Sequence, residues 1–350
     1  MLKYILKRLV YMVLVWVILS FLMFMIYWSV PTGNREFQEA KMEVESNDAY
    51  RRLPAQEKRA LIEELTLEKQ YANGTETNNL FVRYLRWLGF YPYHDGQPRG
   101  MLQGNFGYSQ IYKKDVMEVV KAPMGNTVFI NIFATLLALG ITIPLGIATA
   151  VHRGSRGDKT MQVLTIIGYS LPTFIIAILF IWIFCWNAKW FPASGFGTPG
   201  NDFTGLKAFG DKMYYLALPL IVMTFCSLGG MTRYVRASMI EALGMDCIRT
   251  ARAKGLKERT VIYSHAWRNA LIPVITLVVG WFLGIFSGSV MIEQIFGLNG
   301  MGNLLITALN AFDFEVVLFL QMFYVTLSLL GNLIIDLAYG LADPRVRVNK

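Results

Sequence analysis

The residues best placed to do chemistry in this 350-residue sequence lie in one polar stretch between Tyr234 and Pro273. Ile240, Leu243 and Cys247 recur there at helical spacing, which predicts a helix with one apolar face. The segment that follows interleaves charged and small residues and ends at a glycine: Asp246, Arg249, Thr250, Ala251, Arg252, Ala253, Lys254 and Gly255. A short helix ending at Gly255 would present methyl groups and cations together, so the pattern predicts docking into a groove on a partner protein.

The sequence lacks the residue patterns of a catalytic site. It contains three histidines and neither His-Glu-x-x-His nor Gly-x-Ser-x-Gly. The segment from Gly154 to Thr160 has no glycine directly before its lysine and no strand ahead of it, so it indicates a basic turn rather than a phosphate-binding loop. Cys185, Cys226 and Cys247 show no Cys-x-x-Cys spacing, and we expect each to be a small buried apolar residue. We therefore expect no catalysis, no metal and no cofactor in this chain.

Two further sets of polar residues fall along single helical faces within apolar segments. The first set is Thr127, Asn131 and Thr135, and the second is Gln321, Tyr324, Ser328 and Asn332. Such stripes either hydrogen-bond neighbouring helices, at about 0.6 kcal/mol for each contact, or line a hydrated translocation path. The pattern leaves both interpretations open.

The elements that position these residues are predicted to be membrane-spanning helices. Hydrophobic residues make up 54% of the chain and charged residues 16%, against about 45–50% and about 25% in soluble domains. Apolar runs long enough to cross a bilayer lie near 9–30, 126–151, 161–187, 213–233, 271–292 and 314–338. This predicts an all-α polytopic membrane protein with six transmembrane helices. The prolines at 144, 172, 219 and 273 are expected to kink these helices at most.

The distribution of Lys and Arg predicts the topology. Seventeen of the 33 lie in the N-terminus, the 152–160 and 233–270 loops and the tail, which places these parts and both termini in the cytoplasm. Residues 31–125 carry 13 cations and 13 anions and are predicted to form an extracytoplasmic domain, with Pro54 ending one helix and starting another. The predicted division is therefore 1–30, 31–125, 126–338 with a cytoplasmic loop at 234–270, and a tail at 339–350. The net charge of +9 thus reflects topology and not a nucleic-acid partner.

Several motifs resemble one family of transporters. The run from Arg249 to Leu256, followed by His-x-x-Arg-Asn-Ala-Leu-x-Pro ending at Pro273, resembles the EAA loop of ABC importer permeases in the oligopeptide/dipeptide (peptide/nickel) branch. Ser-Leu-Pro-Thr at 170–173, Glu293 with Gly-Met-Gly at 300–302, and Asp-Pro-Arg at 343–345 extend the resemblance over nearly the whole chain. Arg249 stands where the broader EAA pattern has Glu, a departure that the peptide branch shares.

The resemblance implies a type I ABC importer permease fold in a bacterial cell membrane. The partners it implies are a second, homologous permease, two ATP-binding ABC subunits that hold ATP and Mg²⁺, an extracytoplasmic solute-binding protein, and membrane lipid. The 234–270 loop would be the coupling helix, with Ala251 against the ATP-binding subunit and Gly255 as helix cap. The expected cargo is peptides, and the alternative is nickel or another small solute. An ion-coupled carrier or channel is disfavoured because no ionisable residue falls at mid-membrane, and a membrane enzyme because catalytic motifs are missing.

Overall fold

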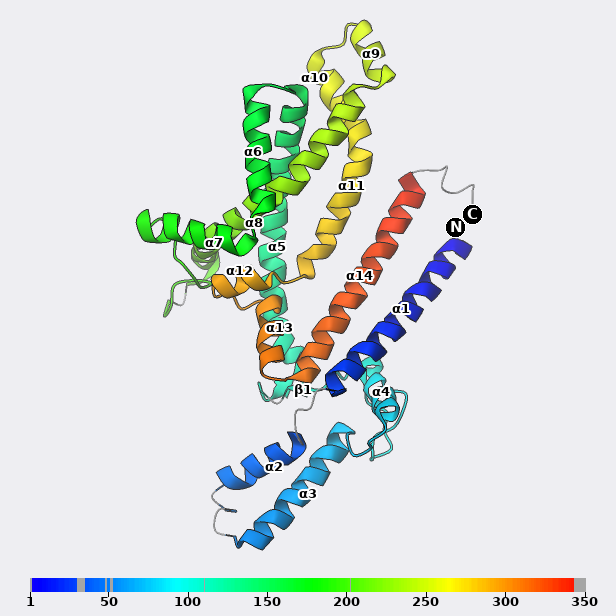
Figure 1. The fold of residues 1–350 in the computed structure, drawn as a ribbon, viewed down its shortest axis with the longest axis vertical. Coiled ribbons are helices and arrows are strands. Elements are labelled where there is room, and N and C mark those ends of the chain that lie inside the picture. Colours follow the sequence, from blue (N-terminus) through cyan, green and yellow to red (C-terminus); the bar gives the residue numbers. More distant parts are fainter. Residues whose placement is uncertain are drawn as a thin grey trace. The chain divides into compact units, whose positions relative to one another are not determined.

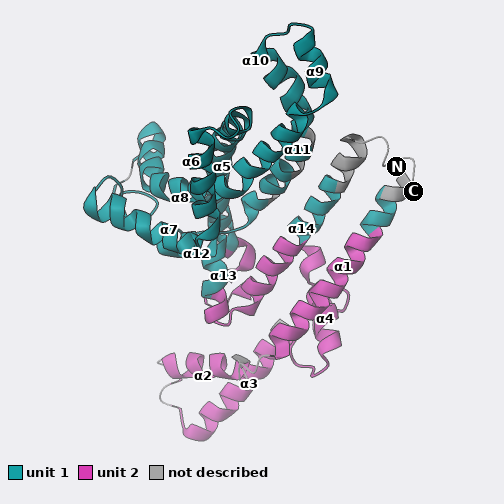
Figure 2. Cartoon of the chain, turned by 45° about the horizontal axis from the view of Figure 1, so that its top comes forward, with its two compact units in different colours: residues 1–9, 120–307, 326–350 teal, residues 10–119, 308–325 magenta. Residues whose placement is uncertain are grey.

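The computed structural model describes residues 2–29, 35–47, 49–50, 53–109, 111–201 and 203–342, and most of them are helical (Figure 1). The predicted tail motif at 343–345 lies outside the described residues. The chain divides into two compact units (Figure 2). Unit 1 comprises residues 1–9, 120–307 and 326–350, and unit 2 comprises 10–119 and 308–325. Unit 2 thus groups the predicted 31–125 domain with most of the first helix, which differs from the predicted boundaries.

Among the described residues, four helices are long and apolar enough to cross a membrane. They are α1 (Leu2–Ser29), α5 (Val116–Val151), α8 (Gly205–Leu243) and α14 (Phe314–Ala342). Each exceeds the roughly 20 residues that a bilayer requires. Counting each of two sharply bent helix pairs as one span brings the number of candidate spans to six.

The predicted span at 161–187 is not one straight helix. It consists of α6 (Arg156–Ser170) and α7 (Thr173–Phe180), which continues as a π-helical segment to Asn187, with a bend of 107° between the two parts. Pro172 causes the break, because its ring disfavours helical backbone in the preceding residue, and Leu171 is extended at φ −83° and ψ 135°. The expectation that prolines only kink these helices is therefore wrong at Pro172.

The predicted span at 271–292 begins and ends earlier in the sequence than expected. A short helix, α10 (Glu258–Thr260), leads into a π-helical turn at Val261–Ala266 and then α11 (Trp267–Leu283). A 3₁₀ turn at Gly284–Phe286 ends this run, and the separate helices α12 (Val290–Ile295) and α13 (Met301–Asn310) follow. Glu293 therefore lies outside the candidate spans.

The helices of unit 1 enclose two apolar cores. One core joins α5, α8, α9 (Asp246–Ala253), the π-helical turn and α11, with Met239, Ile248 and Val261 fully buried. The other joins α5, α7, α8 and α12. Helices α6 and α8 approach each other closely at Gly229. A Cβ on this residue would lie 2.6 Å from the Thr165 carbonyl oxygen, so only glycine fits this crossing.

Unit 2 is built on α1, α2 (Arg35–Ser46), α3 (Ala55–Asn73) and α4 (Leu80–Leu88). Phe24, Tyr84, Leu88 and Leu318 form its buried core, and the Ser20 and Tyr84 hydroxyls hydrogen-bond at 2.7 Å. A 3₁₀ turn at Met101–Gln103 precedes the antiparallel pair of β1 (Tyr108–Ser109) and β2 (Lys114–Asp115). Pro54 directly precedes α3 as predicted, but the helix before it ends at Ser46 and not at the proline.

Candidate functional site

The predicted coupling segment forms a separate short helix, α9. Asp246 opens it, where a negative charge interacts favourably with the helix N-terminus, and Arg252 lies in its last turn, where a cation does the same. The helix ends in a Schellman motif: the Gly255 amide donates to the Arg252 carbonyl at 2.9 Å, and the Leu256 amide donates to the Ala251 carbonyl at 3.4 Å. Gly255 adopts φ +75°, a left-handed conformation that costs glycine little. The predicted helix end at Gly255 is therefore present, with Lys254 as the cap residue.

The inward face of α9 contradicts one prediction. Ala251 is 5% exposed and belongs, with Ile248, to the buried core formed with Val261, Ile262 and Ala266. Its methyl group fills space inside this chain, so Ala251 cannot lie against an ATP-binding subunit. The spacing of small residues in the sequence did not reveal that Ala251 is buried, because its neighbours Val261 and Ala266 belong to a later helical segment.

The outward face of α9 is polar and fully accessible. Asp246, Arg249, Thr250 and Ala253 are exposed and follow one another at helical spacing. Arg249 pairs with Asp246 at 3.3 Å, and Thr250 donates to the Asp246 carbonyl at 3.0 Å. This face is the part of the predicted segment that a partner can touch.

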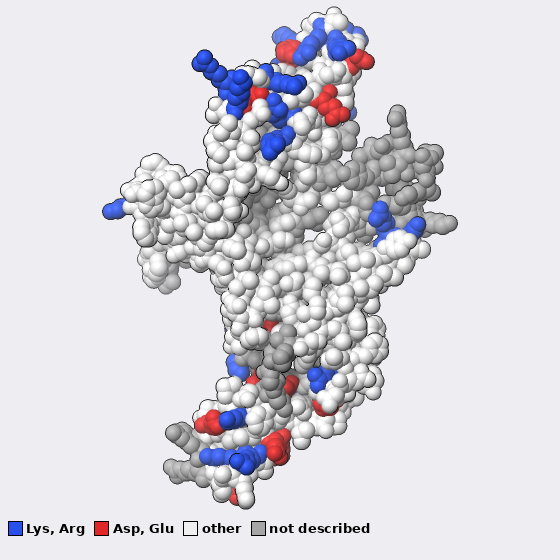
Figure 3. All heavy atoms as spheres, viewed as in Figure 1, with Lys and Arg blue, Asp and Glu red and all other residues white. Residues whose placement is uncertain are grey.

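Cations and apolar side chains surround this outward face. Lys and Arg gather at the end of unit 1 that carries α9 and α10 (Figure 3). Arg252 is tied to Glu258 by an ion pair at 2.6 Å, whereas Met245, Leu256 and Tyr263 expose large apolar surfaces. Cys247 is also exposed, which corrects the expectation that it is buried, and Cys185 and Cys226 are only partly buried.

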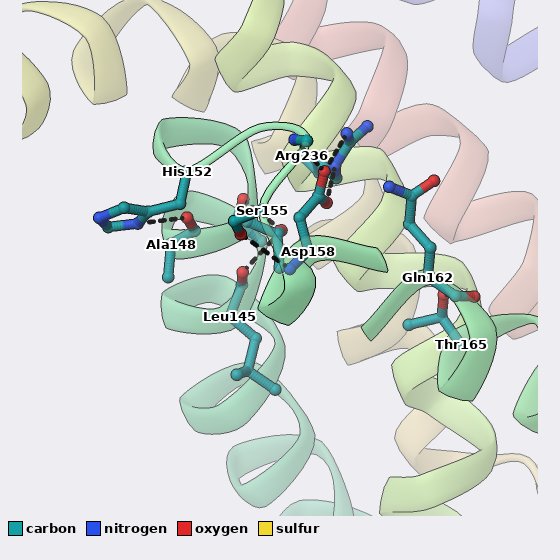
Figure 4. Close-up of polar contacts among 11 residues, drawn as sticks. Leu145, Ala148, His152, Ser155, Asp158, Gln162, Thr165 and Arg236 are labelled. Atoms are coloured by element: carbon teal, nitrogen blue, oxygen red, sulfur yellow. Dashed lines mark hydrogen bonds and ion pairs between the residues drawn. The ribbon is translucent and has the colours of Figure 1, made fainter. Parts of the chain in front are cut away.

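A buried ion pair joins α6 to α8, the helix that leads into α9. Arg236 donates from Nε to Asp158 Oδ1 at 2.8 Å and from Nη2 to Oδ2 at 2.9 Å (Figure 4). Asp158 is 2% exposed, and its Oδ2 also accepts the Gly154 amide at 2.9 Å. Ser155 caps α6 by accepting the Asp158 amide at 3.1 Å. The Ser155-x-x-Asp158 spacing is a helix-start pattern that could have identified this turn in the sequence.

The first polar stripe is used for packing within unit 1. Thr127 and Asn131 are buried, and Asn131 Nδ2 donates to the Ile285 and Ser287 carbonyls at 2.8 and 2.9 Å. Thr135 is half-buried. Of the two interpretations that the sequence left open, the hydrogen bonds favour helix packing for Thr127 and Asn131.

The second stripe is divided between the two units. Gln321 and Tyr324 belong to unit 2 and are half-buried, whereas Ser328 and Asn332 belong to unit 1 and are exposed. The second stripe is therefore not a feature of a single unit, and Ser328 and Asn332 are its exposed members.

Glu293 forms a buried polar centre that the sequence indicated only as part of a motif. It is 3% exposed, its Oε1 accepts the Thr127 hydroxyl at 3.0 Å, and its Oε2 accepts the Asn303 amide at 2.7 Å. The Thr127 hydroxyl in turn accepts the Met301 amide at 2.8 Å, so both groups satisfy the first turn of α13. A Cβ on Gly300 would collide with the Glu293 carboxyl group, which explains the first glycine of the Gly-Met-Gly motif.

Burial controls the protonation of this carboxyl group. Desolvation raises the pKa of Glu293, and the hydrogen bonds from Asn303 and Thr127 oppose this rise. The group links α5, α12 and α13, and among the described residues no cluster of His, Cys, Asp or Glu suited to a metal ion accompanies it. Its chemistry is that of a packing centre.

The chain is similar to several known membrane transport proteins. Residues 142–348 match the family described as binding-protein-dependent transport system inner membrane component. The oligopeptide transport system permease protein AppB of Bacillus subtilis is 36% identical over 76% of this chain and 80% of that protein. The dipeptide transport system permease protein DppB of Escherichia coli is 36% identical over 72% and 79%. A solved structure of the MetNI methionine ABC transporter in inward-facing conformations matches at 16% identity and TM-score 0.46, covering 63% of this chain and 97% of that chain.

Proposed function

The chain belongs to the family of binding-protein-dependent transport system inner membrane components, and on that premise we propose that it is one of two different permease subunits of an ATP-driven importer of peptides. The observation that carries the proposal is the 36% identity, over most of the chain, to permeases of oligopeptide and dipeptide transport. The protein resides in a bacterial cell membrane. Two ATP-binding subunits would hold ATP and Mg²⁺, and a solute-binding protein would deliver the peptide from outside.

The proposed architecture has six spans with both termini in the cytoplasm. The count treats each bent pair, α6 with α7 and α10 with α11, as one span. The concentration of Lys and Arg in the connections at 152–160 and 233–270 supports a cytoplasmic location for α9 and the start of α6. Residues 31–125 would then lie outside the cytoplasm.

The proposed contact with an ATP-binding subunit is the outward face of α9. Arg249 and Thr250 supply hydrogen-bond donors there, and the neighbouring Met245 and Leu256 supply apolar area, a mixture typical of protein interfaces. Ile248 and Ala251 anchor the same helix in the core shared with α8 and α11. A displacement of α9 by its partner would therefore be transmitted to both helices through packed side chains.

Reconstitution tests the proposed cargo. Vesicles that contain this chain, its partner permease and the ATP-binding subunits would be supplied with the solute-binding protein and a labelled peptide or Ni²⁺. We expect ATP-dependent accumulation of peptide and none of Ni²⁺. Accumulation of Ni²⁺ without peptide would assign the alternative cargo, and uptake that needs no ATP would contradict the ABC importer.

Two alanines two residues apart test the coupling face. Ala253→Glu places a charge on the outward face, so we expect an unchanged thermal unfolding midpoint, loss of the ATP-binding subunits in pull-down, and loss of peptide-stimulated ATP hydrolysis. Ala251→Glu forces a charge into the core, so we expect the chain itself to unfold or fail to accumulate. Wild-type stimulation in Ala253→Glu would place the coupling contact elsewhere.

A further inference from the structure

Unit 2 contains a cavity of about 240 Å³ that the transport function above does not use. Its walls come from α1, the end of α3, α4, the segment that leads into β1, and the first turns of α14. Pockets for drug-sized molecules occupy roughly 300–1,000 Å³, so this cavity suits a smaller ligand.

Aromatic rings make up much of the wall, and other rings hold them in place. Trp87 packs against Phe24 with ring centroids 5.6 Å apart, and Phe106 packs edge-to-face against Phe319 at 4.8 Å. Side chains held in position before a ligand arrives lose little conformational entropy on binding. The wall is therefore suited to an apolar or aromatic group.

The same cavity is lined by side chains of both charges. Arg83 is committed to the protein, because it donates to the Thr75 and Thr77 carbonyls and lies 5.2 Å from the ring centroid of Trp28. Arg99 is exposed and pairs with Asp95 on the surface, an interaction typically worth about 1 kcal/mol or less. A carboxylate of a ligand can replace Asp95 at small cost.

A negative side chain reaches the cavity from the first turn of α14. Glu315 lines it, and a Cβ on Gly107 would lie 2.9 Å from Glu315 Cγ. Gly107 has φ +89°, so glycine is required there both for the backbone and for the approach of the glutamate. Asp115 of β2 adds a second carboxylate to the lining.

We propose that this cavity binds a small zwitterion with an aromatic or apolar side chain, with its carboxylate at Arg99, its ammonium at Glu315, and its side chain among the rings of Trp87 and Phe106. Both a free amino acid and a short peptide have this chemistry. The site is one of binding on unit 2 and needs neither ATP nor transport, so its test is independent of the importer's.

Calorimetry on the full chain in lipid nanodiscs, without nucleotide or binding protein, measures the binding. The probes are phenylalanine and alanyl-phenylalanine, each compared with its N-acetyl form, which lacks the ammonium, and its amide, which lacks the carboxylate. We expect saturable binding of the zwitterions and roughly tenfold weaker binding of each blocked form. The zwitterion that binds more tightly identifies amino acids or peptides as the source.

Two variants assign the two ends of the ligand. Arg99→Gln should weaken zwitterion binding roughly tenfold and leave the affinity for the amide unchanged. Glu315→Gln should also weaken zwitterion binding roughly tenfold, but it should leave the affinity for the N-acetyl form unchanged. Arg59→Gln and Glu57→Gln, exposed residues of α3 outside the lining, serve as matched controls and should bind as wild type. Absence of zwitterion binding at millimolar concentration, equal binding of the blocked forms, or wild-type affinities in Arg99→Gln and Glu315→Gln would overturn the proposal.

Discussion

At the scale of single residues, Glu293 is the centre of a buried hydrogen-bond network in unit 1. Its carboxylate and the Thr127 hydroxyl together accept two amides of the first turn of α13. Burial of the carboxyl group disfavours its charged form, whereas the hydrogen bonds that it accepts from Asn303 and Thr127 favour that form. This balance makes the residue a source of pH-dependent stability.

The raised pKa of Glu293 predicts that the free energy of unfolding falls as pH rises. Between the ordinary carboxyl pKa of the unfolded chain and the raised pKa of the folded chain, the folded state binds more protons than the unfolded state. The free energy of unfolding therefore decreases as pH rises through this window. The total decrease is about 1.4 kcal/mol for each unit by which the two pKa values differ. Glu293→Gln cannot titrate and should lack this fall. Thermal unfolding between about pH 4 and pH 8 measures the effect.

The control for this prediction is Glu241→Gln, which changes an exposed carboxylate on α8. It should reproduce the pH dependence of the wild type. Equal slopes for the wild type and Glu293→Gln would show that other groups cause the pH dependence.

We predict that Asn131 contributes to the stability of the fold, and that its replacement affects transport only through the loss of folded protein. Asn131→Leu removes the donor to the carbonyls of Ile285 and Ser287, of which Ile285 is buried, and an unsatisfied buried group costs about 1–3 kcal/mol. We expect a lower thermal midpoint and less assembled complex. Asn332→Leu, at an exposed position of the other stripe, should keep the wild-type midpoint. An Asn131→Leu protein of normal stability that no longer transports peptide would restore the translocation-path interpretation.

At the scale of elements, α9 depends on the helices beneath it. Its inward face packs with the π-helical turn and α8, and α8 is joined to α6 through Arg236 and Asp158. Removing one member of a buried ion pair leaves an uncompensated charge, which costs more than removing both. The pair therefore offers a way to loosen α6 from α8 without touching α9.

Arg236→Gln is predicted to destabilise the contact of α6 with α8 by on the order of 3 kcal/mol, because Asp158 stays buried without its cation. The double variant Asp158→Asn with Arg236→Gln should recover part of that loss. Hydrogen exchange of the amides of α6 measures the change, and Arg233→Gln, an exposed arginine on α8, is the control. If the double variant lost as much stability as the sum of Arg236→Gln and Asp158→Asn alone, the ion pair would not couple the helices.

At the scale of the whole molecule, the distribution of cations predicts the orientation in the membrane. Positive charge resists transfer across the bilayer, and short connections with excess Lys and Arg stay in the cytoplasm. The 233–270 connection carries this excess, and α2 and α3 carry charges of both signs.

Cysteine labelling tests this orientation. In a variant whose three native cysteines are replaced, Ser46→Cys should react with an impermeant thiol reagent in intact cells, and Lys257→Cys should react only after permeabilisation. Replacement of Cys247 is essential, because it is exposed and lies close to Lys257 in sequence. The opposite labelling pattern would invert the proposed topology.

Features that depend on a few neighbouring residues were readable from the amino-acid sequence. The apolar runs indicate membrane helices, and Gly255 marks the end of α9, because hydrophobicity and the cost of a left-handed backbone are local properties. The motifs around Arg249 identified the family because they too consist of residues that are close together in the sequence. The break at Pro172 could be located in the sequence, but its 107° bend could not, since neighbouring helices set the angle.

The roles of the site residues came from contacts between distant segments. Ala251 turns inward because Val261 and Ala266 offer it a core, and Thr127 meets Glu293 across 166 positions of sequence. A polar stripe specifies one face of a helix but not what lies opposite, so the packed chain alone shows whether its side chains hydrogen-bond a neighbour or remain accessible. Tertiary packing therefore made Thr127 and Asn131 structural residues and left the outward face of α9 exposed.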